Sequence, residues 1–413
     1  MEWKITNIGS LCDRVCSGGT PKSTNNAYYN GNIPWLNTKE VNFNRIYDTE
    51  KNITQLGLEN SSAKWISENS VIVAMYGATA GKVAITKIPI TTNQACCNLS
   101  INSEIADYNF VYYFICSKFY ELSSLANGGA QQNLNAQIIK DFPIKIPVNL
   151  SDQRKIAGIL SALDSKIENN NKINANLEAQ AEALFKSWFV DFTPFKDQPF
   201  VDSELGPIPQ GLKICQISDI SHTLETGRRQ KGGAVSEGIP SVGAEHVKGM
   251  GTYDYSKTKY ISPEFANKLK TGKINGYELL IYKDGGKPGY FIPNFSIFGE
   301  GYPFDLCYLN EHVFKLDFLQ NKGYNIFNYF QFKTNYVMSF LNAQGGKAAI
   351  PGINKKDIEC IYTFAPNNPK VVEFGNFALP LFTKILRNCV ENQWLAALRD
   401  TLLPKLMSGE IKL

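Results

Sequence analysis

Few residues of this chain have the types and spacing that catalysis requires. It contains only three histidines, His222, His246 and His312, and none forms a recognisable nucleophile–base pair. The segment from Gly77 to Lys82 looks like a phosphate-binding loop. However, it has three residues between its glycines where four are required, and Val83 stands where Ser or Thr would hold magnesium. The pattern therefore predicts no nucleotide site.

Two further enzyme signatures are missing from the sequence. No dinucleotide fingerprint of spaced glycines follows a predicted strand. Adenine methyltransferases grip a flipped base with a polar–Pro–Pro–aromatic tetrad, and the nearest approach here, Asn368-Pro369-Lys370, fails that pattern. We expect that the chain has no catalytic residues and binds no cofactor of its own.

The cysteines indicate neither a disulfide framework nor a metal centre. Their number is odd, and no two have the two-residue spacing of a zinc knuckle. With so few histidines, a metal cage would be hard to assemble. We interpret the nine cysteines as buried free thiols: Cys12, Cys16, Cys96, Cys97, Cys116, Cys215, Cys307, Cys360 and Cys389.

The remaining chemistry is that of binding, carried by amide, hydroxyl and basic side chains on glycine-rich segments. Amides and Arg or Lys groups read base edges in the major groove of DNA, and lysines and backbone N–H groups hold phosphates. Any one of these loops could equally be a solvated turn. In the first part of the chain the predicted DNA-contacting residues are Thr20, Lys22, Asn37, Thr38, Lys39, Thr79, Lys82, Gln131, Gln132 and Asn133. In the second part they are Arg228, Arg229, Lys231, His246, Lys248, Lys283, Lys287 and Lys347.

Composition limits the location of the chain but not its ligand. The 42 basic and 38 acidic residues give a net charge of +4, and DNA binding needs a local basic face, not a basic whole chain. The apolar run at 71–75 is far shorter than the roughly 18 residues of a membrane span. The N-terminus also lacks the pattern of a signal peptide. We expect a cytoplasmic protein of two or three globular domains.

The elements that must position these loops occur twice in the same order. Between the two copies the loop residues differ while the frame is kept. One scaffold with two reading surfaces is what recognition of two different half-sites requires. The landmarks that repeat are Ile33-Pro34 with Ile239-Pro240, Gly77 and Gly81 with Gly285 and Gly289, Tyr108–Phe114 with Tyr324–Phe330, Gly128-Gly129 with Gly345-Gly346, and Asn135 with Asn354.

The duplication predicts an α+β fold with two mixed α/β modules in a pseudo-twofold arrangement. Short β-branched and aromatic runs at Val71–Met75, Leu279–Tyr282 and His312–Leu316 are typical of strands. Two long helices, which we expect to form an antiparallel coiled coil, join the modules. The predicted boundaries are 1–148 for the first module, 149–192 for the first long helix, 193–210 for a linker, 211–366 for the second module and 367–413 for the second long helix.

Both long helices carry a coiled-coil seam. From Ile156 to Trp188, and again from Phe374 to Leu406, seam positions recur at alternating steps of four and three residues. Each seam has two asparagines at its centre. A buried amide costs stability but specifies register, because a slipped register would leave it unpaired. The predicted register residues are Asn170, Asn174, Asn388 and Asn392.

Helix direction follows from which side chains would meet. A parallel pair would set Ala181 opposite Arg399, whereas an antiparallel pair sets Leu184 opposite Ala378, one large residue against one small one. We therefore favour antiparallel helices, with asparagine pairs Asn170–Asn392 and Asn174–Asn388.

Three features leave alternatives open. Arg399 lies on the seam, and Pro380 could kink or restart the second helix. Each amphipathic helix could also pack separately on its own module. We expect the linker to be extended because of its four prolines, Pro194, Pro199, Pro207 and Pro209.

Four segments are together specific to one family: Ser151–Ile156 at the start of the first long helix, Val201–Pro209 before the second module, the run 128–135, and its partner Ala348–Asn354. On these segments the chain resembles, over essentially its whole length, the DNA-specificity subunit of type I restriction–modification systems. Two features depart from the family pattern. Leu212 stands where the family usually has Trp, and the second long helix lacks the usual acidic–Gln pair at its start.

The resemblance implies a division of labour between subunits. Each module would be a target-recognition domain that reads one half of a split, asymmetric site in double-stranded DNA. The helix pair would set the spacing and dock two methylation subunits, which bind S-adenosylmethionine, while restriction and motor subunits use ATP and Mg²⁺. Residues 156–188, at about 1.5 Å per residue, span about 50 Å, which is roughly one and a half turns of DNA at about 34 Å per turn.

Two other functions remain open from the sequence. The chain could be a stand-alone DNA methyltransferase or nuclease with an unrecognised motif, in which case the purified chain would turn over DNA. It could also be an adaptor that binds only protein, in which case salt-dependent DNA binding would be absent.

Overall fold

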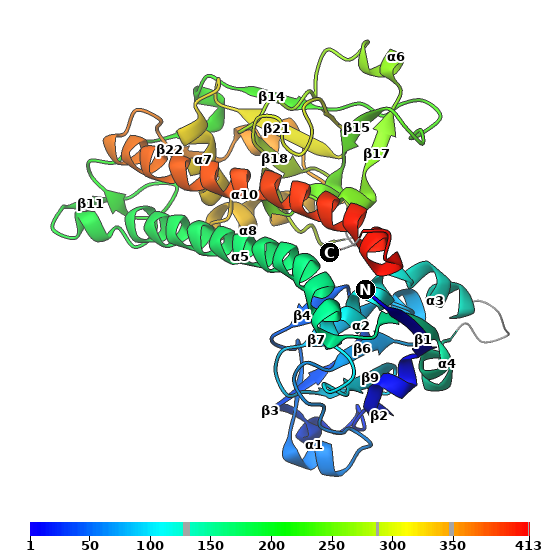
Figure 1. Cartoon of the computed structure of the whole chain (residues 1–413). Coiled ribbons are helices and arrows are strands. Elements are labelled where there is room, and N and C mark those ends of the chain that lie inside the picture. The colour runs from blue at the N-terminus through cyan, green and yellow to red at the C-terminus, as the bar shows by residue number, and fades with distance from the viewer. Residues whose placement is uncertain (127–132, 286–288, 347–350, 412) are drawn as a thin grey trace. The chain divides into compact units, whose positions relative to one another are not determined.

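The computed structural model describes residues 1–126, 133–285, 289–346, 351–411 and 413, and the chain divides into two compact units. Unit 1 comprises Met1–Lys166 and Leu395–Leu413, and unit 2 comprises Ile167–Trp394. The long helices α5 (Leu150–Phe189) and α10 (Pro369–Ser408) each contribute residues to both units (Figure 1). The final segment of the chain therefore belongs to the unit built by the N-terminal module.

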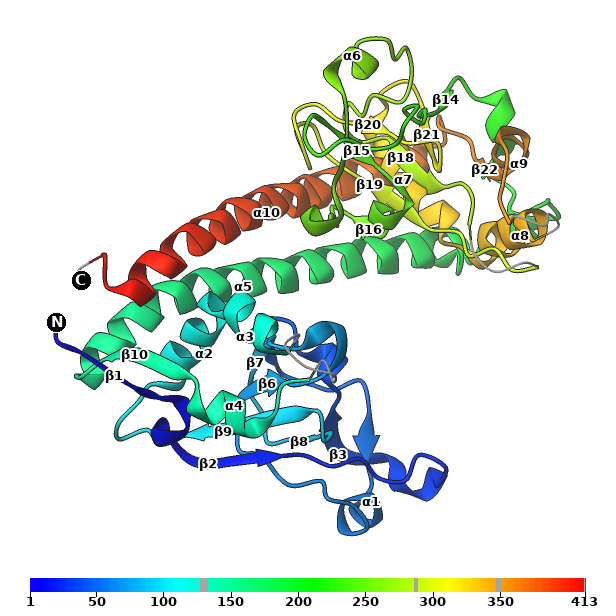
Figure 2. The same cartoon turned by 90° about the vertical axis from the view of Figure 1, so that its right-hand side faces the viewer.

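The described residues of unit 1 form three sheets. The largest has the strand order β2-β9-β6-β7-β4, in which only the edge pair β7–β4 is parallel. In a second sheet, β3 is antiparallel to β5 and parallel to β8, and in the third β1 pairs with β10 (Figure 2). The strands are β1 (Trp3–Asn7), β2 (Cys12–Ser17), β3 (Tyr29–Leu36), β4 (Asn44–Ile46), β5 (Asn52–Ile53), β6 (Val71–Ala74), β7 (Val83–Thr86), β8 (Thr91–Thr92), β9 (Cys96–Ile101) and β10 (Pro143–Pro147).

Unit 2 repeats this topology strand for strand. Its sheets have the orders β14-β21-β18-β19-β16, β17-β15-β20 and β13-β22, and its parallel pairs, β16–β19 and β15–β20, occupy the corresponding places. The duplication predicted from the landmarks is confirmed. The strands are β13 (Ile214–Gln216), β14 (Thr223–Thr226), β15 (Ile239–Val242), β16 (Gly249–Met250), β17 (Lys259–Ile261), β18 (Leu279–Tyr282), β19 (Phe295–Ile297), β20 (Tyr308–Leu309), β21 (Val313–Asp317) and β22 (Tyr362–Phe364).

Equivalent helices cover the large sheet in each unit. Helix α2 (Tyr108–Ser117) packs on β6 and β7, and α7 (Lys322–Phe332) packs on β18 and β19. Each starts at a capping side chain, Asp107 or Asn321, which accepts from a backbone N–H three residues later. The shorter helices are α1 (Gln55–Glu59), α3 (Phe119–Ala126), α4 (Ala136–Asp141), α6 (Pro263–Ala266), α8 (Asn335–Gly345) and α9 (Lys355–Glu359).

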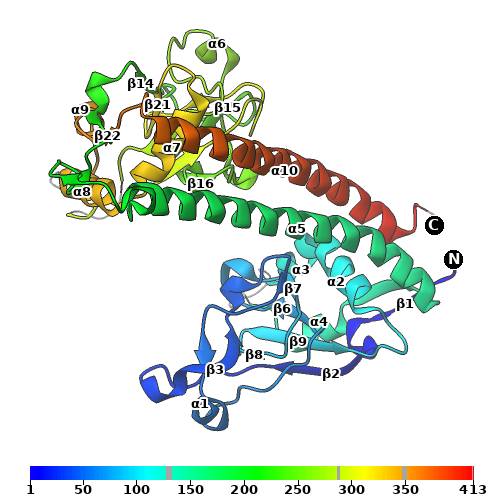
Figure 3. The same ribbon diagram turned by 90° about the vertical axis from the view of Figure 1, so that its left-hand side faces the viewer.

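In unit 1 the first part of α5 lies beside α2 (Figure 3), and the two helices share one buried apolar cluster. Gln153 is fully buried, and its Oε1 accepts from the backbone N of Asp107 at 2.8 Å. Ile156 and Leu160 belong to the same apolar cluster as Leu406 and Met407 of α10. The end of the second long helix thus completes the core of the first module.

In unit 2 the converse holds, because the end of the first long helix completes the core of the second module. Phe185 and Phe189, near the end of α5, are buried among the aromatic side chains of the second module and α10. Phe189 lies 4.9 Å from Phe327 between ring centroids, and Phe185 lies 5.6 Å from Phe374. Neither residue is on the predicted seam, so α5 uses a second face to pack on the module that follows it. The alternative that each helix packs only on its own module is therefore wrong.

The antiparallel pairing of α5 and α10 is confirmed. In unit 2, Asn170 Nδ2 donates to Asn392 Oδ1 at 2.9 Å, and Asn388 Nδ2 donates to Asn174 Oδ1 at 2.8 Å. The charged residue on the predicted seam, Arg399, is also paired, within unit 1. Arg399 Nη1 lies 2.8 Å from Asp164 Oδ1.

For the backbone, one open alternative is excluded and one expectation is corrected. Helix α10 continues through Pro380 without restarting. The segment 193–210 is not an extended linker, because it contains a 3-10 turn at Thr193–Phe195 and the hairpin of β11 (Phe200–Val201) and β12 (Ile208–Pro209). Phe195 and Ile208 are buried in the unit 2 core, so apolar burial folds the segment back despite its prolines. No helix in the described part of the chain is long and apolar enough to cross a membrane.

Candidate nucleic-acid interface

In unit 1 the loop after β2 is held against the end of β8. A Cβ on Gly18 would lie 2.0 Å from the carbonyl O of Thr92, so only glycine permits this approach. The backbone N of Gly19 donates to the same carbonyl at 2.9 Å. Trp35 on β3 donates its Nε1 to Gly19 O at 2.9 Å. These contacts fix the backbone position from which the next residue, Thr20, extends.

The contact between these loops is made by a pair of uncharged side chains. Thr20 Oγ1 donates to Gln94 Oε1, and both residues are exposed. The preceding residue, Asn93, is buried, and its Oδ1 accepts from Ala95 N at 3.1 Å. The buried amide holds the turn, and Gln94 is left at the surface.

Unit 2 builds the same frame. A Cβ on Gly227 would lie 1.7 Å from the carbonyl O of Leu309, the counterpart of Thr92. Asn310 Oδ1 accepts from His312 N at 2.9 Å, as Asn93 does from Ala95. At the positions of Thr20 and Gln94, however, unit 2 has a charged pair. Arg229 Nε lies 3.6 Å from Glu311 Oε1.

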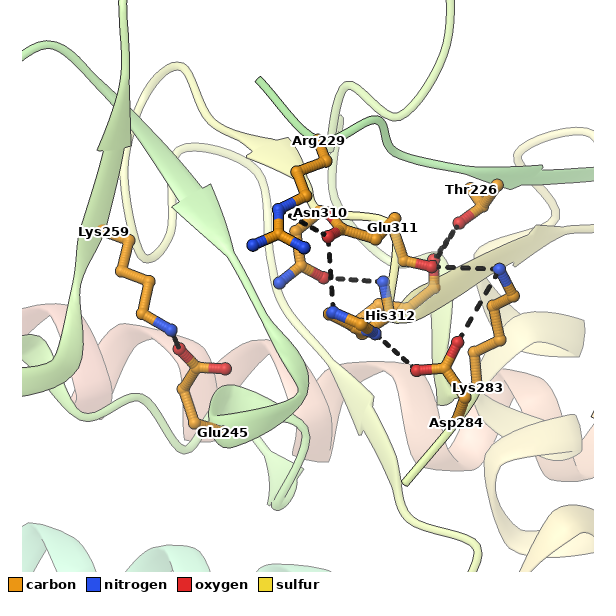
Figure 4. A network of polar contacts seen from close by, with 10 residues as sticks. Thr226, Arg229, Glu245, Lys259, Lys283, Asp284, Asn310, Glu311 and His312 are labelled. Carbon is orange, nitrogen blue, oxygen red and sulfur yellow. Dashed lines mark hydrogen bonds and ion pairs between the residues drawn. The ribbon is translucent and has the colours of Figure 1, made fainter. Parts of the chain in front are cut away.

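The charged pair belongs to a larger polar network (Figure 4). His312 Nδ1 contacts Asp284, and its Nε2 lies 3.3 Å from Glu311 Oε1. The backbone O of Glu311 accepts from Lys283 Nζ at 3.1 Å and from Thr226 Oγ1 at 3.3 Å. These side chains come from β14, the end of β18 and the segment between β20 and β21. Arg229 and His312 contact the Glu311 carboxylate, and Lys283 and Thr226 hold its backbone.

The network borders a pocket of about 270 Å³ on unit 2. Lys259 on its wall lies 3.0 Å from Glu245. Burial tends to raise the pKa of Glu245, but backbone N–H groups and Lys259 outweigh it and hold that pKa below its usual value. The pocket thus mixes fixed donors and acceptors, the groups that base edges require. It is lined by Arg228, Arg229, Gln230, Gly233, Ala234, Ser241, Lys259, Tyr260, Ile261, Asn310, Glu311 and His312.

The predicted residues of the first module are spread over four segments, after β2, β3 and β6 and before α4. Asn37 caps the turn at Thr38–Glu40, and Lys39 pairs with Glu50. Thr79 and Lys82 follow β6, where Lys82 Nζ donates to Asn42 Oδ1 at 2.7 Å. The exposed Asn133 forms an isolated bridge with Tyr76 at the end of that strand. Lys22 is exposed, and Gln131 and Gln132 lie outside the described residues.

In the second module Arg228, Arg229 and Lys231 are exposed on one loop, and Lys248 is exposed after β15. Lys283 is partly buried in the network described above. Lys287 and Lys347 lie outside the described residues.

His246 does not lie where a DNA-contacting residue must. It is 1% exposed and stacks on Tyr253 with ring centroids 4.2 Å apart. Its Nδ1 accepts from Gly243 N, and its Nε2 lies 3.3 Å from Asp254 O. Both nitrogens are therefore used inside the fold, and the prediction of a DNA contact for His246 is corrected to a structural role.

Sequence reasoning missed Gln94 on the unit 1 surface, and Lys259, Asp284 and Glu311 on the unit 2 surface. Asp284 and Glu311 are acidic, whereas the predicted residues carry amide, hydroxyl or nitrogen-donor side chains. Alignment of Asn93 with Asn310 in the repeat would have placed Gln94 and Glu311 at equivalent positions. Within the described ranges, no group of three or more His, Cys, Asp or Glu residues could hold a metal ion.

The comparisons with known proteins all match one family. Residues 1–179 match the family described as type I restriction modification DNA specificity domain. The type I restriction enzyme MjaIX specificity subunit of Methanocaldococcus jannaschii is 30% identical over 100% of this chain and 94% of its own length. The HindI specificity subunit of Haemophilus influenzae is 23% identical over 99% of this chain and 100% of its own length.

A solved structure has the same fold. The S subunit of a type I restriction–modification system from M. genitalium superimposes with a TM-score of 0.58 at 17% identity, covering 98% of this chain and 96% of that one. At that identity the likeness concerns the fold alone.

Proposed function

Because this chain belongs to the family of type I restriction–modification DNA-specificity subunits, we propose that its two modules each read one half of a bipartite, asymmetric DNA site. The observation that supports this most is the contrast between frame and surface. The strand order is the same in both units, yet equivalent positions hold Thr20 and Gln94 in one and Arg229 and Glu311 in the other. Two reading surfaces of different chemistry suit two different half-sites.

The long helices have a second role in this proposal. Each is 40 residues long, and the asparagine pairs allow one register between them. A fixed register gives a fixed spacing between half-sites. The helix pair also docks two copies of the methylation subunit, and restriction and motor subunits join that complex.

Chemistry is assigned to the partner subunits. S-adenosylmethionine would bind to the methylation subunits, and ATP with Mg²⁺ to the motor subunits. The chain itself contributes recognition only, since its sequence lacks a methyltransferase tetrad and a phosphate loop. Such a protein acts where DNA lies, in the cytoplasm of the cell.

The proposal is tested by sequencing methylated adenines in a host that lacks other methyltransferases. The chain and its methylation subunit together should produce a split motif, and either alone should produce none. Arg228→Ala with Arg229→Ala should then relax one half of the motif and leave the other half unchanged. Methyl transfer by the clean chain alone, or a motif altered in both halves, would overturn the proposal.

A further inference from the structure

We propose that one equivalent side-chain pair in each module distinguishes base pairs, and that the two pairs have opposite preferences. Thr20 with Gln94 selects an A·T pair in one half-site, and Arg229 with Glu311 selects a G·C pair in the other. This inference rests on the proposed function, and it names the residues and the bases through which that function is carried out.

The equivalence of the two pairs comes from the frame. Gly18 and Gly227 make the same close approach to the residue that ends the parallel strand, β8 or β20. Asn93 and Asn310 then hold the same turn through the backbone N–H two residues later. The contact made next by each loop, Thr20 to Gln94 or Arg229 to Glu311, therefore occupies the same place in its module.

Both pairs are accessible to a ligand. Thr20 and Gln94 are exposed, the side chain of Arg229 is 78% exposed, and that of Glu311 is 28% exposed. An ion pair with one largely exposed partner, and with 3.6 Å between Arg229 Nε and Glu311 Oε1, contributes little to stability, about 1 kcal/mol at most. The stability of the fold therefore does not explain why this pair is present. Glu311 also has contacts with His312, Lys283 and Thr226, which an ordinary surface ion pair does not need.

The charged pair of unit 2 complements a G·C base pair. Arginine has only donors and forms a two-pronged contact with O6 and N7 of guanine. An ionised glutamate has only acceptors and takes the N4 hydrogen of cytosine. Against A·T, the Glu311 carboxylate would meet O4 of thymine, where two acceptors repel. The contacts of Glu311 with His312 and Arg229 hold it as an oriented acceptor.

The neutral pair of unit 1 complements an A·T base pair. A glutamine amide combines a donor and an acceptor and matches N7 and N6 of adenine. Thr20 already donates its hydroxyl to Gln94 Oε1, which orients the amide, and the threonine methyl group suits the C5-methyl of thymine. The pair offers no guanidinium for guanine.

The test is an exchange between modules. Arg229→Thr with Glu311→Gln gives unit 2 the side chains of unit 1, and Thr20→Arg with Gln94→Glu does the reverse. Each variant is expressed with the methylation subunit, and methylated motifs are sequenced. The first should change one position of one half-site from G·C to A·T, and the second should change one position of the other half-site from A·T to G·C. Each preference should shift by about 5- to 150-fold, the range for a two-pronged base contact.

A matched control is available in unit 2. Lys322→Thr with Glu300→Gln removes an exposed ion pair of the same kind, 2.6 Å long, outside the pocket. It should leave the motif unchanged. Thermal unfolding of all variants should stay within a few degrees, which separates recognition from misfolding.

Several outcomes would overturn the inference. If the exchanged variants methylate the original motif, or if affinity falls equally for all sequences, these pairs touch phosphate or nothing at all. If the altered position accepts bases other than those named, the assignment of bases is wrong. In these cases the split motif persists and the proposed function stands. Loss of the split motif in the unaltered protein would instead refute the proposed function.

Discussion

Asn388 on α10 donates its side-chain Nδ2 to Oδ1 of Asn174 on α5 at 2.8 Å. Asn174 in turn donates to Cys389 Sγ at 3.6 Å. About one helical turn along α5, Asn170 Nδ2 donates both to Asn392 and to Glu391 Oε2. A polar layer thus interrupts the apolar contact between the helices within unit 2, and a shift of either helix would leave its amides without these partners.

Two variants should show separately how this polar layer affects the free energy of unfolding and how it affects the register of the helices. Asn174→Leu alone should lower the free energy of unfolding by about 1–3 kcal/mol, because the amide of Asn388 loses its acceptor. Asn174→Leu with Asn388→Leu should recover that loss or exceed the wild type, because two apolar side chains then meet. Urea unfolding measures both effects.

The double variant should also associate or populate other registers, visible in size-exclusion chromatography, because no amide specifies the pairing. Asn176, exposed on α5, is the control, and its replacement by Leu should change stability by less than about 0.5 kcal/mol. A double variant several kcal/mol less stable than the wild type, with its register intact, would show that the asparagines do something else.

Asp164 should be the important partner of Arg399. Its carboxylate accepts from Arg399 Nη1 at 2.8 Å and from Tyr113 Oη at 2.6 Å, and its side chain is only 13% exposed. Asp164→Ala should destabilise unit 1 by about 1.5–3 kcal/mol, because two donors lose a charged acceptor. Adding Arg399→Met should restore part of the loss, since no uncompensated charge remains.

Asp400 provides the comparison for this test. It lies 2.8 Å from Arg399 Nη2, but its side chain is 63% exposed. Asp400→Ala should therefore cost no more than about 1 kcal/mol by thermal or urea unfolding. Equal losses for Asp164→Ala and Asp400→Ala would contradict the role of burial.

Unit 2 should lose stability in mild acid through His246. Burial lowers the pKa of His246 from its ordinary value of 6.5, so the unfolded chain binds the proton more readily than the folded one. The stabilising contribution is complete above about pH 6.5 and declines as the pH falls below that value. His246→Gln does not titrate, and its melting temperature should change less between pH 7.5 and 5.5 than that of the wild type.

His222→Gln is the control for this pH effect. His222 is a second unit 2 histidine, near Glu359 at 3.9 Å. This variant removes a histidine of the same unit without touching His246, so a change of pH dependence that both variants share does not belong to His246. If His246→Gln keeps the pH dependence of the wild type, other groups cause the loss of stability in acid.

Lys22 and Lys231 should contact phosphates. They follow Gly18 and Gly227 by the same number of residues, and both are exposed. Lys22→Ala or Lys231→Ala should weaken DNA binding equally for all sequences and flatten the salt dependence of the logarithm of the binding constant by about 0.9 per lost contact. Fluorescence anisotropy of the assembled complex at several salt concentrations measures this. Lys268→Ala, at another exposed position of unit 2, should have no effect, and a changed methylation motif in either loop variant would contradict the phosphate assignment.

Much of the architecture could be predicted because it depends on local spacing and on repetition. The strands at Val71 and Leu279 follow from short apolar runs, and the two modules follow from landmarks in a constant order. The direction of the helices follows from the side chains that would face each other, because a parallel pair would set Ala181 opposite Arg399. Each of these inferences needs only the order of residues and the period of the element.

Tertiary structure decided which distant residues meet. Gln94 lies 74 residues after Thr20, and only the parallel pairing of β3 with β8 brings their loops together. His246 lies in a loop whose polar sequence predicts exposure, but the surrounding fold buries it. Phe185 and Phe189 leave the coiled-coil seam to pack on the second module, because burial of large aromatic surface outweighs the period of a single helix. Contacts of this kind depend on the neighbours that the whole fold supplies, so no spacing within one segment could reveal them.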